Sequence, residues 1–147
     1  MGVEIAAMTP ADFDQALALW RVTPGVGIND ADTPKGIHAL LERNPGLSQV
    51  ARLNGEIIGT VLCGHDGRRG YLYHLAVAAA HRSRGLGRSL VEAALARLAA
   101  CGIRKCHIFV YAHNTGGESF WRQTGWVERT ELKIMSRDLV LPGEDES

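Results

Sequence analysis

Residues 75–88 of the chain read Leu-Ala-Val-Ala-Ala-Ala-His-Arg-Ser-Arg-Gly-Leu-Gly-Arg. The apolar start of this stretch is typical of the end of a buried strand, and its glycines stand where a helix begins. The first turn of a helix presents backbone N–H groups without a partner inside the helix, and glycines let an anion approach them closely. Arg82, Arg84 and Arg88, with His81 beside them, add positive charge. The stretch therefore predicts a turn that binds a pyrophosphate, against the alternative that these arginines are only solvated in a loop.

Two common phosphate-binding motifs are excluded. A Walker loop needs Gly-Lys-Ser or Gly-Lys-Thr, and no such sequence follows Gly87. A dinucleotide-binding turn needs a third glycine and an acidic residue about 20 positions further on, where this chain has Lys105-Cys106-His107. The class of the turn has to be identified from the rest of the chain.

Strand and helix patterns alternate on both sides of this turn. Asn54-Gly55 between two apolar runs is typical of a type I′ hairpin. Thr9-Pro10 predicts the start of one helix, and Asp32 or Thr33 before Pro34 the start of another. We expect helices from about residues 10, 34, 86 and 115, and strands at 3–8, 47–53, 56–64, 71–77, 105–111, 126–131 and 133–138.

The predicted order of elements is β-α-α-β-β-β-α-β-α-β-β. The strand, helix and strand across residues 71–111 should form a parallel, right-handed crossover, and the preceding strands an antiparallel meander. This describes a single-domain α/β fold, with a mixed, mostly antiparallel sheet flanked by helices. We assign residues 1–140 to the domain and 141–147 to a frayed C-terminal tail.

The composition narrows the function classes. With 147 residues, of which 46% are hydrophobic, the chain can form one core. Sixteen Lys and Arg balance sixteen Asp and Glu, so no net field attracts nucleic acid or anionic lipid. No apolar stretch approaches the ~20 residues that cross a bilayer. We expect a cytoplasmic protein that binds neither nucleic acid nor membrane, and its cysteines, without CxxC spacing, to be reduced thiols and not metal ligands.

The turn and a second element together resemble one family. Leu75-Ala76-Val77 followed by Arg82-x-x-Gly85-x-Gly87 resembles the R/Q-x-x-G-x-G/A signature of the GNAT superfamily of acetyl-CoA-dependent N-acetyltransferases. Asn114, eleven residues before Gly125-Trp126, resembles the Asn and Gly-aromatic element after the fifth strand in that family. The order of elements agrees over nearly the whole chain. Three further segments resemble the YpeA-like group of small stand-alone bacterial acetyltransferases, namely Ile28-Asn29-Asp30, Gly59-Thr60-Val61 and Met135-Ser136-Arg137-Asp138-Leu139.

The resemblance implies how acetyl-CoA binds. The backbone of Leu75, Ala76 and Val77 would pair with the pantetheine arm and hold the thioester carbonyl. Asn114 would contact the same arm where the fourth and fifth strands diverge. The pyrophosphate would bind the backbone amides of Arg82, Ser83, Arg84, Gly85, Leu86, Gly87 and Arg88.

The usual acid and base of the family are absent from their usual places. Trp121 stands where many relatives carry a Tyr that protonates the CoA thiolate, and an indole N–H is a poor proton donor. We expect Trp121 to belong to the helix core. Phe109 and Tyr71 stand where some relatives carry a Glu that acts as the general base. The thiolate can leave unassisted or be protonated by water, because a thiol with a pKa of ~8.5 is a tolerable leaving group.

Five residues remain as catalytic candidates: His74, His113, Tyr73, Asp30 and, near the point where the fourth and fifth strands diverge, Tyr111. His74 and His113 qualify because a neutral imidazole is the natural base near pH 7. Tyr73 precedes His74 on the same strand, and Asp30 lies in a Gly-rich loop between the first two helices. Each has a structural alternative: a hydrogen-bonding histidine, a packed tyrosine or a helix cap. We expect Asp30 to face Tyr73 and His74 across an acceptor cleft.

These features predict transfer of an acetyl group from acetyl-CoA to a primary amine by direct attack. A small molecule or a peptide N-terminus is the expected acceptor, because an α-amino group is roughly a tenth neutral at pH 7 and a lysine far less. The alternative is a CoA-binding sensor or inactive domain, which the missing Tyr and Glu would suit. The expected partners are acetyl-CoA, the amine and, as a candidate assembly, a second copy in a homodimer.

Overall fold

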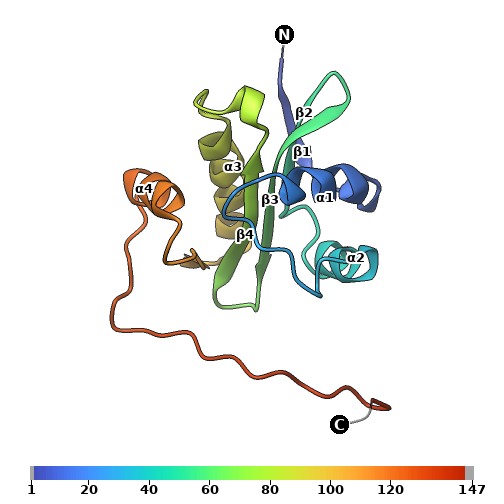
Figure 1. The fold of residues 1–147 in the computed structure, drawn as a ribbon, viewed down its shortest axis with the longest axis vertical. Coiled ribbons are helices and arrows are strands. Elements are labelled where there is room, and N and C mark those ends of the chain that lie inside the picture. Colours follow the sequence, from blue (N-terminus) through green and yellow to red (C-terminus); the bar gives the residue numbers. More distant parts are fainter. Residues whose placement is uncertain (1, 145–147) are drawn as a thin grey trace.

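The computed structural model describes residues 2–144 (Figure 1). Five strands form one sheet in the order β1-β2-β3-β4-β5. The expected sequence of elements is confirmed from the first strand to the last helix. The elements are β1 (Glu4–Ala7), α1 (Phe13–Arg21), α2 (Pro34–Arg43), β2 (Gln49–Leu53), β3 (Glu56–His65), β4 (Gly70–Val77), α3 (Leu86–Ala100), β5 (Cys106–Ile108) and α4 (Thr115–Gln123), with short 3-10 turns at Pro10–Asp12 and Ala79–His81.

The β2–β3 hairpin turns where the Asn-Gly pair predicts. Asn54 has a φ of 53° and Gly55 a φ of 80°, both in the left-handed region that a type I′ turn requires. Leu53 pairs with Glu56 across the turn. Antiparallel pairing continues from β1 through β4, so the meander is confirmed.

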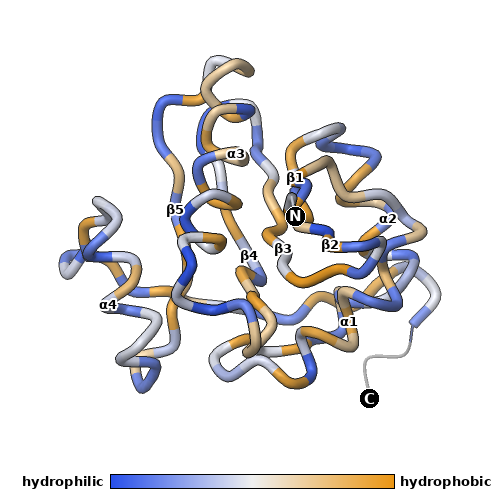
Figure 2. Tube along the Cα trace, turned by 90° about the horizontal axis from the view of Figure 1, so that it is seen from above, coloured by the Kyte–Doolittle hydropathy of each residue, from blue (hydrophilic) through white to orange (hydrophobic). Residues whose placement is uncertain are grey.

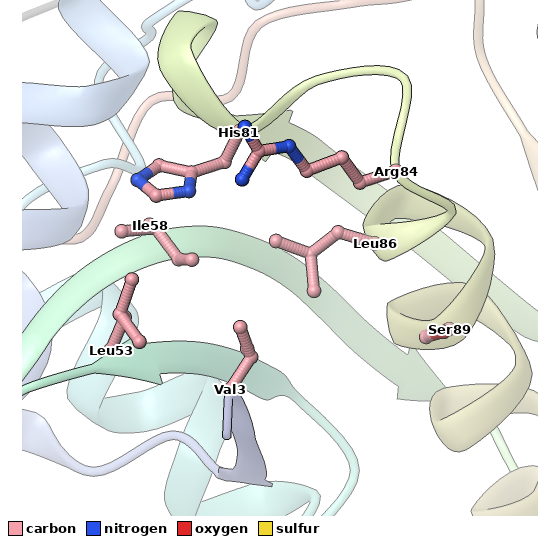
Figure 3. Close-up of a pocket in the computed structure, with 7 residues that line it drawn as sticks. All are labelled: Val3, Leu53, Ile58, His81, Arg84, Leu86 and Ser89. Carbon is pink, nitrogen blue, oxygen red and sulfur yellow. The ribbon is translucent and has the colours of Figure 1, made fainter. Parts of the chain in front are cut away.

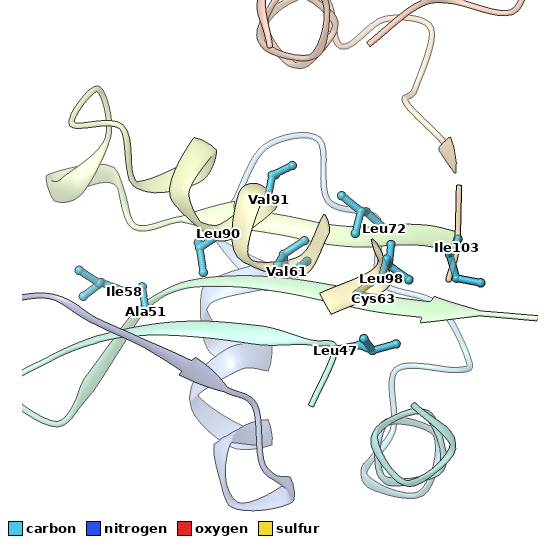
Figure 4. Packing of buried hydrophobic residues seen from close by; sticks show 11 residues of the cluster. Leu47, Ala51, Ile58, Val61, Cys63, Leu72, Leu90, Val91, Leu98 and Ile103 are labelled. Atoms are coloured by element: carbon cyan, nitrogen blue, oxygen red, sulfur yellow. The ribbon is translucent and has the colours of Figure 1, made fainter. Parts of the chain in front are cut away.

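Helices cover both faces of the sheet. On one face α3 buries Leu90 and Leu98 in a cluster with Val61 (Figure 4). On the other face α1 buries Trp20 in a cluster with Val50. The view along the other axis shows α3 and α1 on opposite sides of the strands (Figure 2). No helix within residues 2–144 is long and apolar enough to cross a membrane.

The crossover through α3 is parallel, as expected. Leu72 of β4 pairs with Ile108 of β5, and the two strands run in the same direction. β5 contains only Cys106–Ile108, which is shorter than the strand expected at 105–111. It is the last strand of the sheet.

The two strands expected at 126–131 and 133–138 are wrong. These residues form no strand, and the chain after α4 runs away from the sheet (Figure 1). A strand needs a neighbour for its backbone N–H and C=O groups, and alternation of apolar residues cannot supply one. Of the tail expected at 141–147, residues 141–144 are exposed and form a turn, and residues 145–147 lie outside the described residues.

Candidate active site

The turn before α3 has the backbone that an anion site requires. Gly85 precedes the helix with a φ of 78°, and no side chain caps the first turn. The Ser89 amide donates to the Gly85 carbonyl at 3.0 Å. The amides of Leu86, Gly87 and Arg88 precede this first helical bond and have no acceptor within the helix. A Cβ added at Gly85 would meet nothing within 4 Å, so the turn is open in front of this residue.

The basic side chains of the turn point in different directions. Arg82 Nε donates to the Val77 carbonyl at 2.9 Å, which holds its guanidinium at the end of β4. His81 and Arg84 instead extend over a hollow of about 360 Å³ (Figure 3). The residues that line the hollow are Val3, Leu53, Ile58, His81, Arg84, Leu86 and Ser89.

A bulge in β4 sets the direction of His74. Thr60 pairs with Ala76 but Leu62 pairs with Tyr73, so β4 has one residue more than β3 between these pairs. His74 lies in this bulge with a φ of 50°, which is uncommon for a residue with a side chain. The carbonyl of His74 accepts a hydrogen bond from Thr60 Oγ1 at 2.9 Å.

The core holds the bulge in place through Trp20. Trp20 Nε1 donates to Thr60 Oγ1 at 2.9 Å, and both residues are buried. The Trp20 ring also packs against the His74 ring in a tilted edge contact, with 4.7 Å between centroids. A strained backbone persists where its surroundings determine it, and here two buried side chains do so.

The His74 ring forms a hydrogen bond with Asp32. His74 Nε2 lies 2.7 Å from Asp32 Oδ2, and the two side chains are only 11% and 5% exposed. The same carboxylate oxygen accepts from the Asn29 amide at 3.0 Å. Asp32 is an acceptor, so the contact assigns the proton to Nε2 and leaves Nδ1 of neutral His74 as the basic nitrogen.

The acid that meets His74 is therefore Asp32, where the sequence led us to expect Asp30. Asp30 is exposed, and the contact comes from the residue two positions later. Neither aspartate caps α2. Thr33 does so, because its Oγ1 accepts from the Gly36 amide at 3.0 Å. Thr33 stands directly before Pro34, the favoured residue at the first helical position, and this signal could have excluded Asp32 as the cap.

Tyr73 and His113 lie in different surroundings. Tyr73 is 40% exposed and stacks on Tyr71 with 6.4 Å between ring centroids. Burial raises the pKa of Tyr73 above its usual value, and Tyr71 adds to this effect. His113 is exposed and stacks on Tyr111 at 5.4 Å. The structure thus places Tyr73 beside His74 on one strand and His113 after β5.

The loop between α1 and α2 lies against the segment between β5 and α4. A Cβ at Gly27 would overlap the hydroxyl of Tyr111, and one at Gly25 would overlap the side-chain amide of Asn114. Asn114 itself caps α4, because its Oδ1 accepts from the Gly117 amide at 3.0 Å. The two glycines allow this close approach, so the loop that carries Asp32 is anchored at three places.

Trp121 packs as expected from the sequence. It is half-buried, and its ring meets those of Phe120 and Trp126 edge-on at 5.1 Å each. All three side chains lie against the cluster under α3. This packing against the α3 cluster accommodates the large indole of Trp121.

Comparisons with known proteins identify the family of the chain. The sequence profile of the acetyltransferase (GNAT) family matches residues 13–126. An acetyltransferase of Photorhabdus laumondii is 30% identical over 97% of this chain and 99% of its own length. An uncharacterized N-acetyltransferase of Yersinia pestis is 34% identical over 94% of this chain and 97% of its own length.

Solved structures share the fold. The PaiA N-acetyltransferase from Thermoplasma acidophilum, in complex with coenzyme A, aligns with a TM-score of 0.74 and 17% identity, over 85% of this chain and 89% of its own. The family match includes both the glycine turn and His74. The chain therefore belongs to the acetyltransferase (GNAT) family and is an acetyltransferase.

Proposed function

We propose that this enzyme transfers the acetyl group of acetyl-CoA to a primary amine, and that His74 is the base. The observation that carries the proposal is the place of His74 in the fold. It lies in the β4 bulge directly before Leu75, where the backbone expected to hold the thioester begins, and it is paired with Asp32. A base at this point would be close to both reacting groups.

Acetyl-CoA would bind at the end of β4 and the start of α3. The free amides of this helix end and its dipole favour a pyrophosphate there. The Val77 carbonyl already accepts from Arg82, so a pantetheine amide that pairs with Val77 would share or displace this guanidinium. The proposed contacts remain those expected from the sequence: Leu75, Ala76, Val77, Asn114 and the amides of Arg82, Ser83, Arg84, Gly85, Leu86, Gly87 and Arg88.

The reaction needs three proton transfers: two protons leave the amine nitrogen, and one reaches the CoA thiolate. The ammonium form of the acceptor gives a proton to Nδ1 of His74, and the resulting imidazolium is stabilised by Asp32. The neutral amine attacks the carbonyl carbon of the thioester and forms a tetrahedral intermediate. The C–S bond then breaks, and the CoA thiolate takes a proton from the hydroxyl of Tyr73. The Tyr73 phenolate in turn takes the extra proton from the nitrogen of the new amide, and His74 returns its own proton to solvent. A raised pKa suits Tyr73 to this role, because the phenol stays protonated at neutral pH.

The acceptor surface favours a cation. Tyr71, Tyr73 and Phe109 stack with 6.1 to 6.4 Å between centroids, and Tyr73 and Phe109 are 40% and 56% exposed. Aromatic faces attract an ammonium group, and the Asp32 carboxylate adds negative charge. A small amine or a peptide N-terminus fits this chemistry better than an anionic substrate.

A CoA-binding sensor is the second candidate. The observation that favours it is Trp121. Its packed indole stands where many relatives carry the Tyr that protonates the CoA thiolate. The two functions differ in turnover: a sensor binds CoA without consuming acetyl-CoA when amines are present.

The test measures CoA release from acetyl-CoA with a panel of small amines and peptides with free N-termini. His74→Gln should lower kcat/KM at least ~100-fold and keep the thermal shift that CoA produces. His38→Gln, an exposed histidine of α2, is the matched control and should change nothing. If His113→Gln shows the loss instead, the base is His113. If CoA binds but no acceptor supports turnover, the protein is a sensor.

A further inference from the structure

Four rings form a continuous row along β4 and β5. Tyr71 and Tyr73 of β4 stack with 6.4 Å between ring centroids. The Tyr71 ring also lies 5.7 Å from that of His107 in β5 and 6.1 Å from that of Phe109, the residue after β5. Tyr71 and His107 are paired across the two parallel strands, so the rings follow both of them. We call these four residues the ring row.

The ring row lies on the sheet face that carries α1 and α2. Tyr73 pairs with Leu62, which is buried in the cluster that includes α1. Tyr71 pairs with Gly64, where an added Cβ would meet a side chain of α2. Residues directly opposite each other on neighbouring strands point to the same face of a sheet. The His74 ring packs against α1 on this face as well, so the ring row leads to the proposed base.

The end of the ring row that is distant from His74 is basic. Arg69 stands two residues before Tyr71. Lys105 stands two residues before His107. Side chains two residues apart along a strand point to the same face. The Gly70 amide donates to the Lys105 carbonyl at 2.9 Å, so the two strands begin side by side, and both basic side chains are exposed.

These two cations are not neutralised by a carboxylate. Among residues 2–144, neither Arg69 nor Lys105 takes part in an ion pair. Asp66, the acid of the same turn, accepts from the backbone amides of Arg68 and Arg69 at 2.8 Å each, and its ion pair is with Arg68. The basic end is therefore complementary to an anionic group of a bound molecule.

We propose that the acceptor is a peptide that lies extended along this face, with its free N-terminus at His74, an apolar side chain on the ring row and acidic residues at Arg69 and Lys105. The inference rests on the proposed function, because it takes His74 as the base. A strand advances ~3.3 Å per residue, so Tyr73 and Arg69 are about 13 Å apart along the chain. An extended peptide covers this distance in about four residues, which places its acidic groups at the fourth and fifth positions.

The charges of such a peptide match both ends of the face. Its reacting end is still an ammonium group, which the Asp32 carboxylate and the rings attract. Its acidic groups lie beyond the ring row, where the two cations stand. A small amine would occupy the His74 end alone and leave the ring row and the basic end in solvent.

Three acceptors test the inference in the CoA-release assay. The first is a pentapeptide with a free N-terminus, phenylalanine at its second position and glutamate at its fourth and fifth positions. The second carries lysine in place of both glutamates. The third is phenylalanine amide, an α-amine with the same ring and no chain beyond it. The acidic peptide should exceed the lysine peptide about tenfold in kcat/KM at low salt, and added salt should reduce this preference. It should also exceed phenylalanine amide.

Charge reversal at the basic end tests the same contact from the side of the protein. Arg69→Glu combined with Lys105→Glu should invert the preference, so that the lysine peptide becomes the better acceptor. Arg68→Glu combined with Arg104→Glu is the matched control. It makes the same change in net charge one residue away from each position, at exposed side chains, and should keep the preference for the acidic peptide.

The outcomes separate this inference from the proposed function. Equal kcat/KM for the two peptides, an equal value for phenylalanine amide, or an inversion by the control variant as large as that by the Arg69 and Lys105 variant overturns the inference. Transfer to any of the three acceptors leaves the proposed function in place in each of these cases. Transfer to no amine or peptide rejects the proposed function, and the inference with it.

Discussion

Asp32 Oδ2 and His74 Nε2 lie 2.7 Å apart and join a loop between two helices to a bulge in the sheet. Both side chains are almost buried, so solvent screens their interaction only weakly. The Asn29 amide binds the same oxygen and fixes the carboxylate from the loop side. In the proposed mechanism Asp32 is therefore a positioning residue for His74, and it would act on the reaction through the imidazole.

Asp32→Asn should lower kcat by roughly tenfold to a hundredfold, the range for loss of an orienting partner. An amide can present its N–H to Nε2 and favour the other tautomer, which leaves the basic nitrogen on the wrong side. The KM for acetyl-CoA should stay nearly the same, because the glycine turn is not altered. Steady-state kinetics with each substrate varied in turn measures the difference.

Asp30→Asn is the control for Asp32. The residue lies two positions earlier in the same loop and is exposed, so its kinetics should be close to those of the unaltered enzyme. A larger effect at residue 30 than at residue 32 would return the acceptor-side role to Asp30.

Gly85→Ala should abolish CoA binding at concentrations that saturate the unaltered protein. Gly85 has a φ of 78°, and a side chain there costs about 1–2 kcal/mol in backbone strain and narrows the approach of the pyrophosphate. Gly67→Ala is the control, because Gly67 has a φ of 92° and equally open surroundings in the turn between β3 and β4. Both variants should lose similar stability, but only Gly67→Ala should keep the thermal shift with CoA. An equal shift in both would place the pyrophosphate elsewhere.

Local signals predicted much of this fold, and the errors concern contacts distant in sequence. Asn54-Gly55 determines its own turn, and the glycine turn before α3 depends on a few adjacent residues. The contact between Asp32 and His74 joins residues 42 positions apart and depends on the path of a whole loop, so no spacing rule identified it. The strands expected at 126–138 failed because pairing needs a neighbour that a pattern does not contain.

Trp121→Phe should cost about 1 kcal/mol of stability and keep turnover within a few-fold. The indole packs on Phe120 and Trp126, and a phenyl ring fills most of the same volume. Trp121→Tyr would place a phenol at the position of the family's usual acid. Because the phenol adds a proton donor for the CoA thiolate, turnover should stay the same or rise. Thermal denaturation and CoA release measure the two effects. A large loss of turnover in a stable Trp121→Phe would mean that the indole takes part in the reaction.

Asp12→Asn should destabilise the fold at neutral pH and much less in acid. Burial raises the pKa of Asp12, but the hydrogen bonds from Arg52 and Thr9 outweigh this and hold it below its usual value of 3.8. Arg52 donates to both carboxylate oxygens, at 2.7 and 2.8 Å. A lowered pKa in the folded state adds stability above the unfolded pKa, and this is lost as the pH falls through the folded pKa. Urea denaturation should show a difference of about 1–3 kcal/mol at pH 7 that shrinks below pH ~4. A difference independent of pH would assign Asp12 a role in packing alone.

Tyr73→Phe should lower kcat about a hundredfold, because it removes the proton that the CoA thiolate would take. Burial raises the pKa of Tyr73 above 10.0, so its acid form persists through neutral and moderately alkaline pH. A general acid is active while protonated. In the unaltered enzyme a loss of rate caused by Tyr73 should therefore begin only above its usual pKa, and the variant should lack this alkaline limb. Tyr71→Phe, in the ring that stacks on Tyr73, is the control and should keep both the rate and the limb. If Tyr73→Phe retains full kcat while CoA binding is intact, water protonates the thiolate, and Tyr73 serves the acceptor site through its ring.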